Sequence, residues 1–529
     1  MQLVAYGAQD FYLTGNPQIT FFKVVYRRHT NFATESIEQT FNGSSAWGSR
    51  AVCNLQRSGD LVTKMYLRLS LPSFDSGNIA QQWAWVSRVG HFMLADVIME
   101  IGGTQIDKLY GDWLNVWYEL ARNFAHDRGY GEMIGDTAAL TTLSQSHEAT
   151  TLYIPLQFAC CRNDGLALPV IALQYHDIKI TVDFSPFEQM INYTSNVVAV
   201  GGVGLNAMKA ALPITNCSLF VDYVYLDNEE RKRFAQASHE YLFEQLQFTG
   251  SETVSQQASK TRLNLNHPCK ELVWNASSGK FFGNAFLAYD PTNMELARVN
   301  ATKRFVLRCA LYNGATSLNN VAAGNALSPA AVLSTANAST FGAIRAIYLN
   351  ADQLDIDNIT ILGRLLTVEE FSTPSSMLFA GSTLTGTNTV GNAPTSDGAA
   401  TNDVVVYQWD NYGCYLDGSR NPSARVLLQL NGHDRFSQRE GAYFNYVQPY
   451  QCHTNTPADG INCYSFSLNP EQHQPSGTCN FSRIDNATLN VTYDDAFYFQ
   501  DGNSQFNVYA LNYNVLRVMS GMGGLAYSN

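Results

Sequence analysis

Apolar and polar residues alternate with a period of two along much of this chain, and few folds accommodate that pattern. The alternation runs through 61–71, 97–101, 152–158 and 178–184. A strand of this kind has one face for a core and one face for water, which suits antiparallel sheets packed as a sandwich. Helical signals are short, as at 112–120, where apolar residues follow the 3.6-residue period behind Asp112, a candidate cap. We therefore predict an all-β fold with short helices.

The two halves of the chain resemble each other. Residues 38–44 (EQTFNGS) have an echo in 244–251 (EQLQFTGS). Later strand segments recur in the same order, 153–158, 178–184 and 219–226 in one half and 464–468, 489–493 and 506–513 in the other. A chain of 529 residues also exceeds what one hydrophobic core usually organises. Together these features predict a duplicated β unit.

The segment 227–235 (DNEERKRFA) separates the two halves. Its acidic residues come first and its basic residues last, as the dipole of a short helix favours. We expect an N-terminal arm at 1–24, a first unit at 25–226, a linker at 227–237 and a second unit at 238–529. The second unit is longer, and its excess falls in low-complexity stretches near 310–343 and 374–403. These are predicted to be surface loops, because long insertions between strands cost little closure entropy.

The charge of the chain argues against a nucleic-acid-binding role. Net charge is −12 with only 33 lysines and arginines, and the densest basic runs, at 27–29 and 231–233, are short. Charged residues make up 15%, against roughly 25% in ordinary domains, while the chain holds 28 Tyr and 29 Phe. This composition favours burial of the outer surface against other chains. A monomer with polar but uncharged loops is the alternative.

Neither secretion nor membrane insertion is expected. Residues 1–6 (MQLVAY) have no basic region followed by a long apolar one, so no signal peptide is predicted. The charge-poor stretch 310–344 is interrupted by polar residues every few positions, which favours a loop over a membrane helix. Ten cysteines are scattered without a Cys-x-x-Cys motif, as expected of free thiols in a reducing compartment.

No pattern in the chain predicts catalysis, a cofactor or a metal. The only cluster of metal-ligating residue types is Cys452, His453, Cys463, His473 and Cys479, and its irregular spacing disfavours zinc. The adjacent acids at 369–370 and 494–495 are poor candidates for a catalytic pair, because neighbours on a strand point to opposite faces. We predict that the chain is not an enzyme.

Several segments carry a family resemblance that extends from one end of the chain to the other. They are 7–32 (GAQDFYLTGNPQITFFKVVYRRHTNF), 101–103 (IGG), 165–169 (GLALP), 172–176 (ALQYH), 222–226 (DYVYL), 265–268 (LNHP), 270–274 (KELVW), 460–485 (GINCYSFSLNPEQHQPSGTCNFSRID) and 512–529 (NYNVLRVMSGMGGLAYSN). With these segments the chain resembles the major capsid proteins of nucleocytoplasmic large DNA viruses. The two long insertions of the second half depart from the family pattern.

The resemblance implies two tandem eight-stranded antiparallel jelly-roll sandwiches, a double jelly roll with short helices and long loops. It also implies a homotrimeric capsomer of pseudo-hexagonal outline in an icosahedral virion shell over an internal viral membrane, assembled in the host cytoplasm. The expected partners are neighbouring capsomers and minor capsid and penton proteins, without direct binding of nucleic acid.

The candidate functional residues are structural. Gly15, Asn16 and Pro17 predict a turn that redirects an assembly arm, after which Phe21 and Phe22 dock. At the other end, Leu525 and Tyr527 are predicted to anchor a compliant tail (SGMGG at 520–524) beneath a neighbouring domain. Asn300 and Asn337 lie in glycosylation sequons, which have little meaning outside the secretory pathway.

A second class of function stays open at this point. Jelly-roll proteins also bind or hydrolyse carbohydrates, with exposed Trp and Tyr side chains stacking on the sugars. A stable trimer in solution favours the shell protein, and a monomer with affinity for glycans favours the carbohydrate-binding protein.

Overall fold

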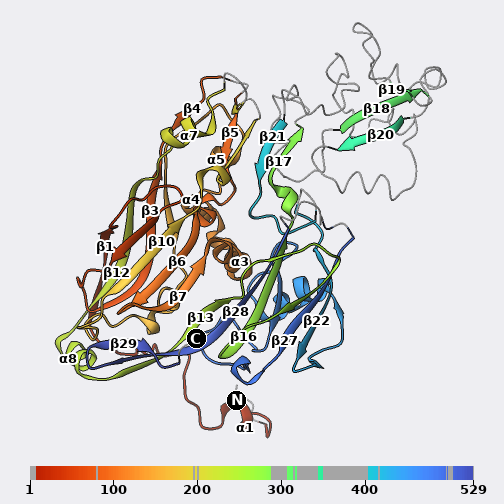
Figure 1. Cartoon of the computed structure of the whole chain (residues 1–529). Coiled ribbons are helices and arrows are strands. Elements are labelled where there is room, and N and C mark those ends of the chain that lie inside the picture. Colours follow the sequence, from red (N-terminus) through yellow and green to blue (C-terminus); the bar gives the residue numbers. More distant parts are fainter. Residues whose placement is uncertain are drawn as a thin grey trace, which may run out of the picture.

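The computed structural model describes residues 7–78, 81–194, 197–198, 202–287, 307–313, 316–317, 344–349, 403–414, 418–495, 497 and 504–527. Figure 1 shows two β sandwiches side by side, with helix α3 between them and both chain termini near the lower edge.

The first sandwich consists of two four-stranded antiparallel sheets. One has the order β1 (Phe32–Thr40), β12 (Thr215–Leu226), β3 (Leu61–Leu71) and β9 (Thr150–Pro155). The other has the order β2 (Arg50–Asn54), β10 (Ile178–Phe184), β6 (Leu94–Ile101) and β7 (Thr104–Tyr110). Eight strands distributed in this way make a jelly roll.

The second sandwich repeats that arrangement. Its first sheet has the order β13 (His239–Phe248), β28 (Gln505–Met519), β16 (Pro268–Ser277) and β25 (Asn462–Ser465), extended by β14 (Glu252–Thr253), β26 (Cys479–Asn480) and β29 (Met522–Leu525). The other has the order β15 (Ala258–Arg262), β27 (Ala487–Tyr493), β22 (Ser423–Leu430) and β23 (His433–Asp434), with β24 (Arg439–Glu440) also paired to β22. The predicted double jelly roll is therefore confirmed.

The strand echoes in the sequence correspond to equal positions in the two sandwiches. Strands β9 and β25 both lie at one end of the first sheet, β10 and β27 both lie second in the other sheet, and β12 and β28 both follow the opening strand. The repeats in the sequence therefore mark a repeat of strand order.

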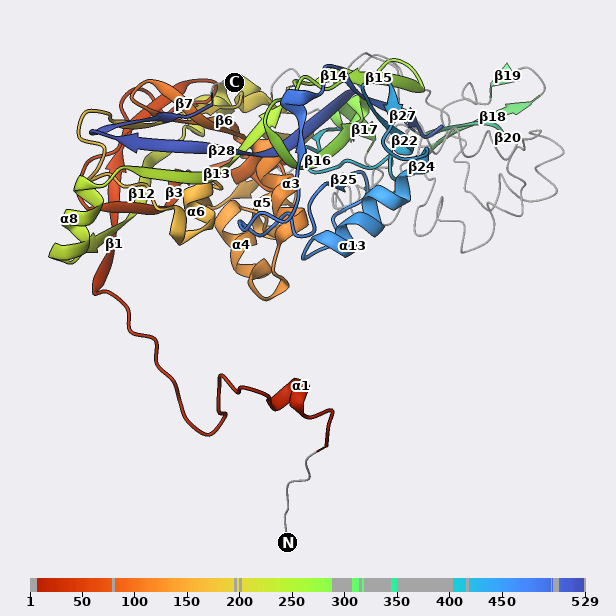
Figure 2. The same cartoon turned by 90° about the horizontal axis from the view of Figure 1, so that it is seen from below.

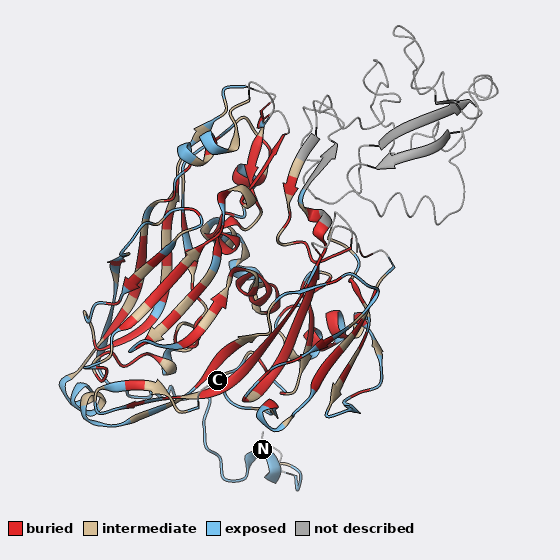
Figure 3. Cartoon of the chain, in the orientation of Figure 1, coloured by how far each residue is buried: buried red, intermediate tan, exposed pale blue. Residues whose placement is uncertain are grey.

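The alternation of apolar and polar residues along the strands explains how each sandwich forms its hydrophobic core. Along β3, Leu67 and Leu69 are fully buried while Arg68 and Ser70 are partly exposed, and the strand ends before Pro72. Figure 3 shows buried residues along the strands of both sandwiches and around helix α3, in the contact zone between the sandwiches. The second sandwich has its own core, which includes Val426, Leu489 and Val508.

The helices are short. They are α1 (Phe11–Thr14), α2 (Val89–Phe92), α3 (Gly111–Ala121), α4 (Asp127–Ile134), α5 (Ala138–Thr141), α6 (Ala159–Arg162), α7 (Leu205–Ala211), α8 (Asn228–Gln236) and α13 (Gln448–Cys452), with a π-helical turn η8 (Tyr443–Val447) and 3₁₀ turns η1 (Phe124–His126), η2 (Asp164–Leu166), η3 (Phe187–Gln189), η5 (Gly279–Phe281) and η9 (Phe481–Arg483). Helix α8 begins after Asp227, whose side chain accepts a hydrogen bond from Glu230 N at 2.9 Å. Asp112 is not the cap of α3, which begins at Gly111, because its carboxylate is bonded elsewhere.

Strands also join the two halves directly. Strands β5 (Trp83–Trp85) and β11 (Ile191–Thr194) of the first half form one sheet with β17 (Phe282–Leu287) and β21 (Asp403–Tyr407) of the second, in the order β17-β21-β11-β5. Tyr193 pairs with Val405 in this sheet. A further pair, β4 (Phe74–Asp75) and β8 (Ser146–His147), belongs to the first half.

The two predicted loops fall mostly outside the described residues. Within 310–343, residues 310–313 belong to strand β18 (Leu307–Asn313) and 316–317 form β19 (Thr316–Ser317), in one sheet with β20 (Ile344–Leu349). A pure loop is therefore wrong at the start of this stretch, where an alternating segment pairs with β20. Of 374–403, only the last residue is described, at the start of β21.

Candidate assembly surfaces

Helix α3 connects the two sandwiches through the carboxylate of Asp112. Tyr412 and Tyr509 of the second sandwich donate their hydroxyls to it at 2.5 and 2.7 Å, and Asn275 donates its amide at 3.0 Å. The ring of Trp113 packs 5.2 Å from that of Tyr509 between centroids. Charge-assisted hydrogen bonds are stronger than neutral ones, so Asp112 fixes α3 on the second sandwich.

A second contact is built around Glu244 of β13, which is 5% exposed. Arg162 of the first sandwich lies 2.8 Å from one carboxylate oxygen, and Lys270 lies 2.5 Å from the other. Burial alone raises the pKa of Glu244, but Arg162, a hydrogen bond from His473 and Lys270 together outweigh burial and hold the pKa at about 2. Arg162 also stacks over Trp117 of α3 at 4.8 Å. We call this the Glu244 cluster.

Backbone groups add to the contact between the sandwiches. Leu246 N of β13 donates to the Asp107 carboxylate at 3.1 Å, and burial raises the pKa of Asp107 to about 6. Asn455 donates from its backbone to Leu120 O at 3.0 Å and from its side chain to Glu119 O at 2.7 Å. Polar contacts at several separated points fix the orientation of one sandwich on the other.

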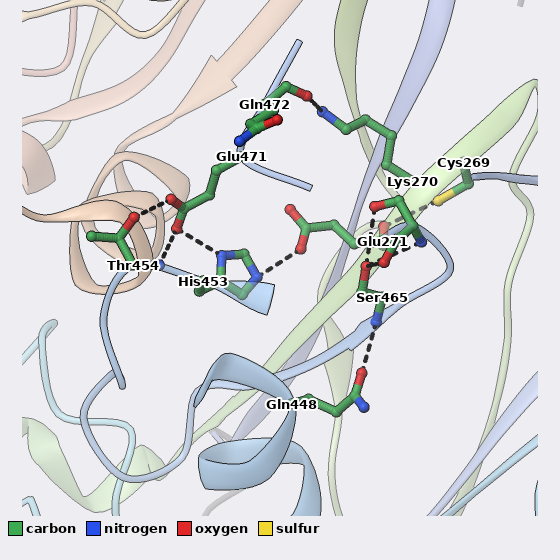
Figure 4. A network of polar contacts seen from close by, with 10 residues as sticks. Cys269, Lys270, Glu271, Gln448, His453, Thr454, Ser465, Glu471 and Gln472 are labelled. Carbon is green, nitrogen blue, oxygen red and sulfur yellow. Dashed lines mark hydrogen bonds and ion pairs between the residues drawn. The ribbon is translucent and has the colours of Figure 1, made fainter. Parts of the chain in front are cut away.

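Figure 4 shows a further buried ion network, inside the second half, around His453 at the end of α13. Nε2 of His453 lies 2.9 Å from Glu271 of β16, and Nδ1 lies 3.0 Å from Glu471. Burial disfavours the imidazolium, but Glu271 and Glu471 outweigh it and raise the pKa of His453 well above 6.5. Among the described side chains, no three His, Cys, Asp or Glu residues are placed to hold a metal ion.

The arm extends away from the sandwiches (Figure 2). Asn16 takes a left-handed φ of 52° before Pro17, whereas Gly15 keeps a φ of −66°. The hydrogen bonds at its tip are local, as from Thr14 Oγ1 to Asp10 O at 2.7 Å. Its apolar side chains face solvent, with Phe21 89% and Phe22 98% exposed. In the single chain these two residues do not dock.

The C-terminal tail folds back as β29 along the end of β28, with Leu525 opposite Leu516. It lies beneath the first sandwich, where Tyr175 N donates to Gly521 O at 3.0 Å and His176 Nδ1 lies 2.9 Å from Gly523 O. Leu525 is partly buried against the core that the sandwiches share, but Tyr527 is 62% exposed. Asn300 and Asn337 lie outside the described residues.

The fold and these contacts define the class of the protein. It is a double jelly-roll protein in which buried polar clusters hold the two sandwiches together. In the part of the chain that the structure describes, no helix has the length and apolar run needed to cross a bilayer.

Comparison with known proteins gives the family. The family model for major capsid protein N-termini matches residues 20–227, and that for large eukaryotic DNA virus major capsid proteins matches 230–524. The major capsid protein of Phaeocystis pouchetii virus is 44% identical, over 100% of this chain and 99% of its own length. That of Paramecium bursaria Chlorella virus 1 is 37% identical over the same shares. The chain belongs to the family of large eukaryotic DNA virus major capsid proteins, whose role is structural and not enzymatic.

Solved structures of capsid proteins support the same family and fold. PBCV-1 VP54, fitted into a cryo-EM reconstruction of the virophage Sputnik, superposes with a TM-score of 0.62 at 34% identity, covering 96% of this chain and 100% of that one. The Faustovirus major capsid protein superposes with a TM-score of 0.59 at 12% identity, covering 97% and 94%, which shows the shared fold alone.

Proposed function

We propose that this chain is the repeating subunit of an icosahedral virion shell and that three copies form a pseudo-hexagonal capsomer. The observation that carries this is the equal strand order of two sandwiches held in one orientation by buried contacts, since three such chains supply six similar units around one axis. Relatives across the whole chain are named as major capsid proteins, which supports a shell over a glycan-binding role.

The proposal includes the surroundings of the subunit. Its partners are neighbouring capsomers, minor capsid proteins and penton proteins, in a shell assembled in the host cytoplasm next to an internal membrane. The chain divides into an arm at 1–24, sandwiches at 25–226 and 238–529, and a linker at 227–237. The 20–227 and 230–524 matches of the two family models support this division.

Size-exclusion chromatography with light scattering tests the oligomer. We expect a stable species at three times the chain mass of 58.6 kDa. Heterologous contacts that close on themselves give one discrete size, whereas contacts that fail to close give filaments. A monomer that binds glycans would instead support the carbohydrate-binding alternative.

Deletion of residues 1–24 tests the arm. Because Phe21 and Phe22 are exposed in the single chain, we expect both sandwiches to keep their circular dichroism and melting temperature. Assembly into shells is expected to fail, because docking of these rings on a neighbour buries apolar surface at about 25 cal/mol per Å². Unfolding of the truncated chain would show that 1–24 is part of the fold and not an arm.

A further inference from the structure

The two sandwiches carry a helical segment at the same place in their strand order. In the first, α3 (Gly111–Ala121) lies between β7 and β9. In the second, Tyr443–Cys452, which comprises η8 and α13, lies between β24 and β25. Each carries two aromatic residues four positions apart, Trp113 and Trp117 in one and Tyr446 and Tyr450 in the other. Such spacing places two side chains on one helix face.

Both aromatic residues of α3 are buried, and Trp113 packs against the second sandwich. Trp113 is 2% and Trp117 8% exposed, and Trp113 packs on Tyr509. The surface that receives α3 is the outer face of the sheet β13-β28-β16. Along β28, Tyr509 and Leu511 belong to the core shared with the first sandwich, whereas the alternate residue Val508 belongs to the core of the second sandwich itself.

The counterpart helix is uncovered. Tyr450 is 83%, Tyr446 43% and Val447 40% exposed. Figure 2 shows α13 on the same side of the molecule as α4, projecting beyond the sheets.

The counterpart sheet is uncovered as well. In the second sandwich, Glu244 pairs across the strands with Tyr513, and both are 5% exposed beneath the first sandwich. In the first sandwich, Glu38 pairs in the same way with Phe220, but the Glu38 side chain is 48% exposed and Phe220 is half-buried. Tyr153, 41% exposed, lies 6.3 Å from Phe220 between ring centroids.

The basic residue beside each of these glutamates is also repeated in the two sandwiches. Lys270 of β16 reaches Glu244 at 2.5 Å, and Arg68 of β3, the strand at the equal position in the first sandwich, reaches Glu38 at 3.4 Å. The first pair is sealed by the neighbouring sandwich, and the second is open to solvent. The first sandwich thus presents an uncovered version of a surface that the second sandwich uses to bind a neighbour.

We propose that the outer face of β1-β12-β3-β9, around Glu38, Phe220 and Tyr153, binds the helical segment Tyr443–Cys452 of a second copy of this chain. The inference rests on the proposed trimer and names its contact surfaces. The occupant follows from the repeat: the contact made once within the chain, helix of one sandwich on sheet of the next, is made again between chains. Each copy then gives one helix and receives one, a heterologous contact that closes a ring at three copies.

Two single substitutions test this, Tyr450→Glu on the helix and Tyr153→Glu on the sheet. Each places an unpaired carboxylate at the proposed contact and leaves an exposed side chain exposed in the monomer. We expect each variant to keep its circular dichroism and melting behaviour as a monomer. The trimer should be lost, because removing a central aromatic weakens a contact by roughly 30-fold or more. Tyr175→Glu is the matched control. Tyr175 is likewise exposed, at 76%, but belongs to neither proposed contact surface, so this variant should leave the trimer intact.

The outcomes separate the two proposals. A monomeric unmodified chain overturns the proposed trimer and the contact with it. A trimeric unmodified chain whose Tyr450→Glu and Tyr153→Glu variants are also trimeric overturns the contact alone.

A cross-link tests the contact without weakening it. With p-benzoylphenylalanine at position 450, trimers mixed from isotopically light and heavy chains are irradiated and digested. We expect mixed-isotope peptides that join position 450 to β1, β12, β3 or β9. Cross-links only to other strands would refute the assignment.

Discussion

Replacing Glu244 with alanine is expected to lower the free energy of unfolding by about 3–5 kcal/mol, as measured for the breaking of buried ion pairs. The substitution leaves Lys270, which is 1% exposed, and Arg162, which is 17% exposed at its side chain, without their carboxylate. Both cations then lie in a dry contact between the sandwiches. Urea unfolding at one fixed chain concentration measures the loss, because self-association shifts apparent stability.

Glu240→Ala is the control on the same strand. Glu240 also pairs with an arginine, Arg517 at 2.7 Å, but both side chains are at least half exposed. Exposed pairs contribute about 0–1 kcal/mol, so the control should change stability little. Equal losses for the two variants would contradict a special role of the Glu244 cluster.

The pH dependence of the Glu244 variant has a defined sign. The folded pKa of about 2 lies below the ordinary value of 4.5, so the carboxylate stabilises the fold above pH 4.5. That contribution is lost as the pH falls from 4.5 towards 2. The difference between the unmodified chain and Glu244→Ala should therefore shrink over this interval.

The strands were predictable from sequence because their signal is local. In β3 and β10 each inward residue is apolar and each turn lies nearby, so a short window contains the needed information. The sheet that joins β11 to β21 was not predictable in this way. Tyr193 pairs with Val405, and nothing in either short segment specifies a partner so far along the chain.

The buried ion clusters show the same limit. His453 was a candidate metal ligand with Cys452, Cys463 and Cys479 because these residues lie close in the chain. The structure does bring His453 to Cys463. It also places His453 against Glu271, 182 positions away, and no local spacing indicated that partner. Glu244, Arg162 and Lys270 also come from separate strands and a helix, and no spacing rule connects them. The turn and the apolar run of the arm are local signals, but docking of Phe21 and Phe22 needs a partner surface. Both rings are exposed in the single chain, so their docking stays a prediction.

Replacing His453 with leucine is expected to destabilise the second sandwich by about 3–5 kcal/mol. The imidazolium lies between Glu271 and Glu471, and its removal leaves two carboxylates facing each other around an apolar side chain. The cost is largest at Glu271, which is fully buried, because water cannot replace the lost partner of its carboxylate. His433→Leu, at an exposed histidine of β23, is the control and should have little effect on unfolding in urea.

A triple variant and a pH profile together test whether the loss of charge causes the destabilisation by His453→Leu. The triple variant Glu271→Gln, Glu471→Gln, His453→Leu removes all three charges and should recover much of the stability, because neutral replacements of buried ion networks are often tolerated. The pKa of His453 is raised, so its contribution is complete below pH 6.5 and is lost as the pH rises through the folded value. The pKa of Glu471 is lowered, so its contribution is complete above pH 4.5 and is lost in acid. The loss caused by His453→Leu should therefore be largest between pH 4.5 and 6.5 and smaller on either side. A loss independent of pH, with no recovery in the triple variant, would mean that His453 acts through packing alone.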